Sequence, residues 1–303
     1  MQIGLAYGDV RGQRDLGVIA EQVRATSGTA WISQGPNLDA LTTLALAGRG
    51  AGELGTAVVP FPQRHPLVLA SHALTVQAAT GNRLILGIGA GISRMVGGMY
   101  GLPTDRPARR LREYLEVLRP LLRGESVNHH GDTLTAVGSV AVEGAAAPPV
   151  LVAALGPAML RVAGELADGT ITWMTGPRTL TNHVVPSITK AADTPPRIVA
   201  GFAVCVTADE GAVRARFAKD FALAGQVPEY RAMLDREGVD GPADVLLVGD
   251  EDTIAKRLDQ LRDTGITDLM LAPIGTAAEQ ARTTEFLATQ HGHDRRAGPA
   301  GAR

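Results

Sequence analysis

The chain has 303 residues, a formal net charge of −2 and one cysteine, Cys205. A charge this close to zero gives no basic surface for nucleic acid or an anionic membrane, so a small molecule is the expected ligand. One cysteine excludes an internal disulfide and a thiolate-based zinc site, and no pair of histidines has metal-ligand spacing with a nearby carboxylate, so we predict no metal.

The first half of the chain alternates short apolar runs with amphipathic segments. Residues 3–7, 30–33, 54–59 and 84–88 are apolar and predict strands. Helices are predicted at residues 16–23, 39–47 and 66–79, and a further helix carries Leu111, Leu115, Leu118 and Leu122 on one face. Residues 94–107 form a glycine-rich connection that is long for a strand–helix loop, so this segment is a candidate lid.

The second half resumes the alternation after an excursion. Residues 125–143 alternate in polarity and predict a hairpin outside the main sheet. Strands are predicted at residues 150–154, 170–173, 198–206 and 269–272. Helices are predicted at residues 157–167, 180–192, 209–221, 250–264 and 277–288, with a helical insertion at 225–243.

Eight strands that alternate with helices, without a β-rich half, predict an α/β fold that is a closed (β/α)8 TIM barrel. We expect one barrel domain over residues 1–290 and a disordered tail, rich in Gly, Ala and Arg, over residues 291–303. A doubly wound open sheet is the alternative, because the pattern does not reveal whether the sheet closes.

The most informative stretch covers residues 53–93. Two apolar strands flank a helix here, the first followed by Pro60 and Pro62 and the second running through Gly87, Gly89 and Gly91. Both strands therefore leave bare backbone at their carboxyl ends, where parallel α/β folds carry their sites. The glycine spacing is wrong for a dinucleotide-binding fingerprint, which needs G-x-G-x-x-G after the first strand.

This stretch resembles the third and fourth strands of the bacterial luciferase-like superfamily. The runs GTAVVP, RHP, LASHALT and GNRLILGIGAG are similar to the branch that uses the deazaflavin coenzyme F420, and a weaker resemblance extends to about Pro273. The resemblance implies a luciferase-like barrel with insertions, F420 as cofactor and oxidoreductase activity.

The resemblance also implies two groups of coenzyme contacts on these strands. In the F420 branch the loop matching Gly89, Ala90 and Gly91 lies against the coenzyme. The position of Ala57 and Val58 matches a bulge that supports the back of the deazaflavin ring, often with a non-proline cis peptide. We therefore predict that the Ala57-Val58 peptide is cis; the alternative is an ordinary buried strand.

The predicted phosphate site is the turn formed by Ala153, Ala154, Leu155, Gly156 and Pro157. Small residues before a helix start leave backbone N–H groups free at the positive end of the helix dipole, which suits an anion. The family places the coenzyme phosphate at this kind of turn, and a plain helix start is the alternative.

A third group of predicted coenzyme contacts ends the strand at residues 170–173. This group would border the ring or the side arm of the coenzyme, and it consists of Trp173, Met174, Thr175 and Gly176. Trp173 could equally belong to the core.

The end of the second strand departs from the family pattern. Many F420-dependent relatives carry an acidic residue and a histidine there, the histidine serving as acid or base near the ring, whereas this chain has Gln34 and Gly35. Where some relatives have a glutamate after the glycine loop, this chain has Ile92. Gln34 is a candidate contact to the ring or substrate, but its amide does not exchange a proton near pH 7. His65, before Pro66, is interpreted as a cap or packing residue.

These features predict hydride transfer between C5 of F420 and a small organic substrate, which the low polarity of Ile92, Met95 and Trp173 suggests is apolar or planar. Substrate protons would come from solvent. The alternatives are an FMN-dependent monooxygenase of the same family and a coenzyme-binding protein with little catalysis. Family members are often dimers, which implies a homodimer. Without a leader or a membrane-spanning apolar run, we expect a soluble, cytoplasmic protein.

Overall fold

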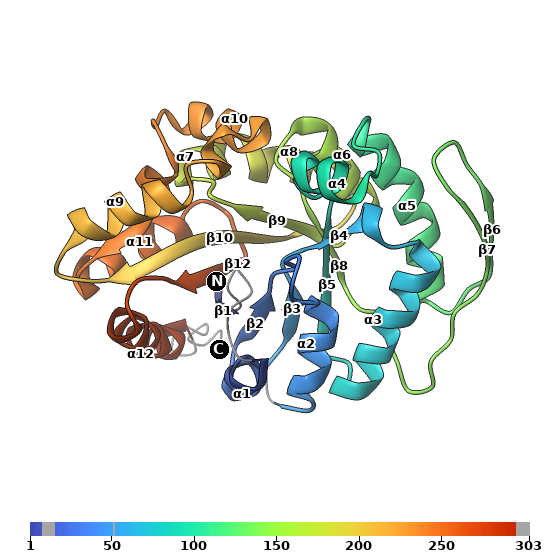
Figure 1. Ribbon diagram of the computed structural model, residues 1–303, viewed down its shortest axis with the longest axis horizontal. Helices are drawn as coiled ribbons and strands as arrows, with labels where there is room; N and C mark the ends of the chain where they lie inside the picture. The colour runs from blue at the N-terminus through green and yellow to red at the C-terminus, as the bar shows by residue number, and fades with distance from the viewer. Residues whose placement is uncertain (8–15, 51, 295–303) are drawn as a thin grey trace, which may run out of the picture. The chain divides into compact units, whose positions relative to one another are not determined.

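The computed structural model describes residues 1–7, 16–50 and 52–294 (Figure 1). Residue contacts divide the chain into two compact units. Unit 1 contains residues 1–6, 172–186 and 198–303, and unit 2 contains residues 7–171 and 187–197. Each unit is described by itself.

Unit 2 is built on parallel strands in the order β2-β3-β5-β8-β9. These are β2 (Thr29–Ile32), β3 (Leu54–Thr56), β5 (Leu84–Gly89), β8 (Val150–Ala153) and β9 (Gly169–Trp173), whose last two residues belong to unit 1. Parallel strands need crossover connections, and helices supply them. We call the side where these strands end the carboxyl edge of unit 2.

The helices of unit 2 pack against one another in chain order. They are α1 (Leu16–Ala25), α2 (Ala40–Ala47), α3 (Pro66–Thr80), α5 (Pro107–Leu122) and α6 (Pro157–Leu166). Their apolar faces are buried, as in α5, where Leu111, Leu115 and Leu118 are fully buried. This layer packs against the strands: α2 contacts β2 and β3, and α3 contacts β5. Within the sheet, the ring of Trp31 lies over Gly55.

The strand predicted at residues 54–59 is two short strands. β3 ends at Thr56, and β4 (Val59–Pro60) continues the pairing with β5. The peptide Ala57-Val58 between them is cis, as predicted. At the break, the hydroxyl of Thr56 accepts a hydrogen bond from the Gly87 N–H (2.9 Å) and donates one to the Gly87 carbonyl (2.7 Å). A side chain therefore replaces one step of the backbone ladder.

Unit 1 contains four parallel strands in the order β11-β10-β12-β1. They are β1 (Gln2–Tyr7, with Tyr7 in unit 2), β10 (Arg197–Val206, with Arg197 in unit 2), β11 (Leu247–Gly249) and β12 (Asp268–Pro273). The helices are α7 (Pro177–Thr179), α9 (Glu210–Asp220), α10 (Pro228–Glu237), α11 (Glu251–Arg262) and α12 (Ala277–Asp294), and the π-helical η2 (Leu180–Val184) leads into α8 (Val185–Ala191), which ends in unit 2. A buried cluster around Cys205, Phe217 and Leu234 forms the core between β10 and its helices.

Several elements differ from the predictions. The segment predicted as a lid loop begins with helix α4 (Ser93–Tyr100). The prediction missed this helix because Gly97 and Gly98, which are poor helix formers, obscure its helical pattern. β11 was not predicted, since three residues are too few to show a period. The last helix runs to Asp294, past the start of the predicted tail, and residues 295–303 lie outside the described residues.

The excursion is a hairpin, as predicted, made of the antiparallel strands β6 (Val127–His130) and β7 (Thr135–Gly138). None of the helices within the described residues is long and apolar enough to cross a membrane.

Candidate functional site

The candidate site in unit 2 lies where its buried strands become partly exposed. β5 is buried along its whole length, but Ala90, directly after it, is partly exposed. Ala57 and Val58 beyond β3, and Ala153 at the end of β8, are also partly exposed. These predicted coenzyme contacts of unit 2 are therefore small residues that reach the surface at one edge.

Gly89 brings three of these strands together. A Cβ atom at Gly89 would lie 2.8 Å from Val58 Cγ2 and 3.0 Å from the Ala153 Cβ. Real Cβ atoms almost never approach so closely, so only glycine fits here. Val58, Gly89 and Ala153, which were predicted as coenzyme contacts, are thus neighbours and form a floor of small groups, which we call the small-residue floor.

The turn after β8 leads from this floor to the start of α6. Gly156 is the N-cap of α6 and has an extended conformation (φ −79°, ψ 155°), and no side chain caps the helix. A Cβ atom at Gly156 would have no neighbour within 4 Å. The turn is therefore open on its outer side, with the positive end of the helix dipole accessible to an anion.

The side-chain amide of Gln34 uses all its hydrogen-bonding groups on its own loop and on Arg64. Its amide nitrogen donates to the carbonyls of Gly35 and Leu38, each at 3.0 Å, and its Oε1 accepts from the Ala40 N–H at 3.0 Å and from Arg64 Nη2 at 3.3 Å. An amide offers two donors and two acceptor sites, so this set uses its whole capacity. Gln34 shapes the loop after β2, and its role toward a ligand stays a prediction.

Arg64 and Gln63 hold unused donors near the same loop. Arg64 pairs with Asp39, the N-cap of α2. Burial works against the charge of Asp39, but hydrogen bonds from Thr42 and the charge of Arg64 lower the pKa of Asp39 below its usual range. Gln63 Nε2 and Arg64 Nη1 are buried and have no hydrogen-bond partner within the described part of the chain. Sequence reasoning missed these two donors.

The histidines have structural roles where the structure defines their contacts. His65 is the N-cap of α3: its Nδ1 accepts from the Leu67 N–H, and its Nε2 lies 2.8 Å from the carbonyl of Thr135 on β7. This confirms the interpretation of His65 as a cap. In addition, no three His, Cys, Asp or Glu side chains of the described residues are grouped so that they could hold a metal ion.

The predicted contacts at residues 173–176 lie in unit 1 and are mostly buried. Trp173 is partly exposed, whereas Met174 and Thr175 are buried in the core, and Met174 has a left-handed φ of 53°. The carboxylate of Glu237 on α10 accepts hydrogen bonds from the backbone N–H groups of Arg178 (3.1 Å) and Thr179 (2.7 Å). An internal anion thus already occupies this turn.

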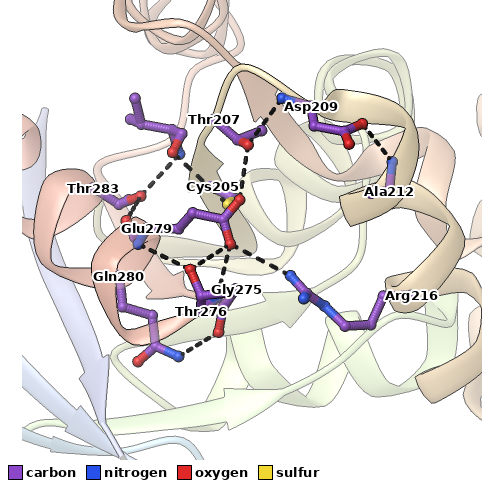
Figure 2. A network of polar contacts seen from close by, with 11 residues as sticks. Cys205, Thr207, Asp209, Ala212, Arg216, Gly275, Thr276, Glu279, Gln280 and Thr283 are labelled. Atoms are coloured by element: carbon purple, nitrogen blue, oxygen red, sulfur yellow. Dashed lines mark hydrogen bonds and ion pairs between the residues drawn. The ribbon is translucent and has the colours of Figure 1, made fainter.

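A polar network joins the carboxyl ends of β10 and β12 in unit 1 to α12 (Figure 2). Glu279 accepts hydrogen bonds from the Thr276 N–H (2.8 Å) and hydroxyl (2.9 Å) and from the Thr207 hydroxyl (2.8 Å), and it lies 3.6 Å from Arg216. The bond from the Thr276 N–H is the first cause that lowers the pKa of Glu279, to about 2. Burial raises the pKa of neighbouring Cys205 to about 11, so its thiol is not a nucleophile at neutral pH.

Two cavities within unit 2 lie away from this edge. One, of about 380 Å³, is lined by residues of α5 and α6 and by Asp168 and Asp193. The other, of about 190 Å³, lies beside Glu53 and Arg83, at the amino ends of β3 and β5. Neither contains a predicted site residue.

Comparisons with known proteins place the chain in a family. A sequence profile of the luciferase-like monooxygenase family matches residues 5–268. This chain belongs to the luciferase-like monooxygenase family. A relative from Methanolobus tindarius, described as 5,10-methylenetetrahydromethanopterin reductase, is 26% identical over 81% of this chain and 85% of its own length.

Solved structures of the luciferase-like family share the fold. The coenzyme F420-dependent tetrahydromethanopterin reductase of Methanopyrus kandleri superposes with a TM-score of 0.73 at 21% identity, over 94% of this chain and 96% of that chain. The oxygenating constituent of 3,6-diketocamphane monooxygenase from Pseudomonas putida, in complex with FMN, also gives 0.73, at 18% identity over 95% and 96%. The luciferase-like fold is a (β/α)8 barrel, as predicted, and the family comprises oxidoreductases.

Proposed function

We propose that this protein is a coenzyme F420-dependent oxidoreductase that transfers a hydride between C5 of the deazaflavin and a small, apolar organic substrate. The observation that carries the proposal is the small-residue floor of Val58, Gly89 and Ala153, which continues into the open turn at Gly156. Such a floor suits a planar ring, and such a turn suits a phosphate.

The residues of unit 2 fit this coenzyme at two points. At Gly89 the backbone itself is the surface, because a Cβ would collide with Val58 and Ala153. At Gly156 the uncapped start of α6 presents backbone N–H groups to an anion without requiring a lysine or arginine. The coenzyme, when bound, would supply the hydride chemistry, while the protein orients the ring and excludes water.

Neither Gln34 nor His65 offers a free acid or base at the carboxyl edge of unit 2. The Gln34 amide is fully hydrogen-bonded and has no exchangeable proton near neutral pH. Both ring nitrogens of His65 are used by the backbone. The proposal therefore assigns binding and orientation to this edge and takes substrate protons from solvent.

FMN is the alternative cofactor, because the Pseudomonas putida relative was solved with it. Titration of the purified protein with F420 and with FMN, followed by ligand fluorescence, separates the two. We expect saturable F420 binding that is at least tenfold tighter than FMN binding. The reverse order would replace the proposal with an FMN-dependent monooxygenase, and binding of neither would leave the small-residue floor a packing feature.

A further inference from the structure

Exposed apolar side chains gather on helix α4. Ile92, its N-cap, is 41% exposed, Met99 is 62% exposed and Tyr100 is 44% exposed. These are three of the nine large hydrophobic residues that are exposed in the described part of the chain, and they lie within nine consecutive positions. Scattered exposed apolar residues need no explanation, but a concentration of them marks a binding surface.

The helical period places these side chains on one face. At 3.6 residues per turn, Arg94, Gly97 and Gly98 lie on the opposite face. Tyr100 lies at the edge of the apolar face, next to Ser93 seven positions earlier. The apolar face, which we call the α4 apolar face, consists of Ile92, Met95, Val96, Met99 and Tyr100. An amphipathic helix normally buries its apolar face, yet within this face only Val96 is buried.

Val96 fixes the orientation of this face. It is fully buried, and its Cγ2 would lie 2.7 Å from a Cβ at Gly91, whose other near neighbour is Pro60. α4 also packs against η1 (Phe61–Gln63). The α4 apolar face is therefore turned toward the loops that follow β4 and β5. The exposed side chains of Ile92, Met99 and Tyr100 lie around the buried Val96.

The position of this face favours one occupant. Ile92 directly follows the glycine loop of Gly89, Ala90 and Gly91, so the face continues from the proposed ring site. A stable interface with a second copy buries about 800 Å² on each partner, which three partly exposed side chains on a helix of eight residues do not supply. A ligand that reaches beyond the ring site does match the size and polarity of this face.

We propose that the α4 apolar face binds the apolar portion of the substrate and selects compounds with an extended hydrocarbon part over short ones. This inference rests on the proposed function for the place of the reacting group. The hydrocarbon contact itself is independent of which flavin is bound. Ile92 and Met99 then act as specificity residues.

The test compares chain-length dependence in matched variants. A homologous series of 2-alkanones, from acetone to 2-nonanone, competes with the apolar dye 1-anilinonaphthalene-8-sulfonate, whose fluorescence reports occupancy. Burial of one methylene contributes up to about fourfold in affinity, so we expect affinity in the wild-type protein to rise with each added carbon. Met99→Ser and the double variant Ile92→Ser/Met99→Ser should flatten this rise and weaken 2-nonanone at least fivefold. Val137→Ser, a change at a side chain 57% exposed on β7, should match the wild type.

The outcomes separate this inference from the proposed function. An unchanged chain-length slope in the double variant, or no displacement of the dye by any alkanone, overturns it. A dimer in sedimentation velocity that the double variant abolishes also overturns it, because the face would then be an interface between copies. F420 affinity is measured in parallel: a flattened slope supports the inference even if the wild type binds no F420, a result that removes only the proposed coenzyme.

Discussion

Arg64 joins the loop after β2 to the loop after β4 by contacts that sequence spacing does not show. It donates to Gln34, 30 positions earlier in the sequence, and pairs with Asp39, 25 positions earlier. Gln34 could therefore be named from the sequence as a polar residue at a strand end, but its full occupancy could not. His65 was interpretable because a cap acts on its own helix, within two residues.

Arg64→Lys should destabilise the protein. One nitrogen of Arg64, Nη2, contacts both Asp39 and Gln34. The compact ammonium group of lysine, on a differently shaped side chain, does not place its donors where the planar guanidinium places Nη2. A hydrogen bond between charged groups contributes about 1.5 to 3 kcal/mol when it is buried. Because the side chain of Asp39 is 38% exposed, solvent screens this pair, and we expect the free energy of unfolding in urea to fall by about 1 kcal/mol. Arg106→Lys is the control, because Arg106 is exposed and pairs only with its exposed neighbour Asp105. Equal effects of the two changes would contradict this role of Arg64.

Glu279 should make stability depend on acid pH. Hydrogen bonds from Thr276 and Thr207 lower the pKa of Glu279 in the folded protein to about 2, below its ordinary value of 4.5. A lowered folded pKa stabilises the protein fully above the unfolded value, and this contribution is lost as pH falls from about 4.5 toward 2. Glu279→Gln should therefore melt below the wild type at pH 6, and the gap should close between pH 4.5 and 2.5. A gap that stays constant over that range would refute the assignment.

At the scale of the element, a helix or strand was predictable from the sequence when it was long and contained little glycine. The long, regular helix α3 and the strand β5 were predicted within about two residues, and the leucines on one face predicted the helix α5. The break between β3 and β4 was predicted only through the family resemblance. The sequence pattern alone hides it, because apolar residues continue through the break. β11 is too short and α4 too rich in glycine for a period to be visible, and the α4 apolar face was therefore read as a loop.

The Thr56 hydroxyl should be essential to the β3–β5 pairing. Thr56→Val keeps the shape but leaves the N–H and carbonyl of Gly87 without their partner. Because buried unpaired groups cost about 1 to 3 kcal/mol each, we expect a loss of about 2 kcal/mol or more in chemical denaturation. Thr170→Val is a matched control, since its buried hydroxyl makes one recorded bond, to the carbonyl of Val152. A larger loss at Thr170 would argue against this explanation of the break.

Gly156→Leu should separate coenzyme binding from folding. The backbone conformation at Gly156 is open to any residue, and a Cβ meets nothing within 4 Å, so the melting temperature should stay near that of the wild type. The larger side chain would cover the start of α6, and we expect F420 affinity to fall at least tenfold. Gly241→Leu is the control, because Gly241 also precedes a helical turn in an extended conformation with open space. Unchanged F420 affinity in Gly156→Leu would exclude this turn as the phosphate site.

At the scale of the whole molecule, the barrel was predictable because eight strands repeat one simple pattern, and the family was predictable from the motifs of residues 53–93. The cofactor and the substrate were not. The family profile over residues 5–268 supports the same barrel fold as the alternation of strands and helices. Similarity to structures that bind F420 and FMN leaves the cofactor to be decided by binding.

Coenzyme binding should stabilise the whole protein if the proposal is correct. A ligand that binds only the folded state at 100 times its dissociation constant adds about 2.7 kcal/mol to the free energy of unfolding. We therefore expect F420 to raise the melting temperature by several degrees, in proportion to the logarithm of its concentration. FMN at the same concentration should produce a smaller shift. An identical shift in Gly156→Leu would show that the stabilising contact lies elsewhere.

The carboxylate of Glu237 links α10 to the start of α7 within unit 1. It holds the N–H groups of Arg178 and Thr179, the donors that a phosphate or carboxylate group would otherwise compete for at this turn. Glu237 follows Thr179 by 58 positions, so one side chain ties together two helices that are distant in the sequence. Removing its carboxylate would leave two N–H groups without their acceptor and loosen the packing of α10 against α7.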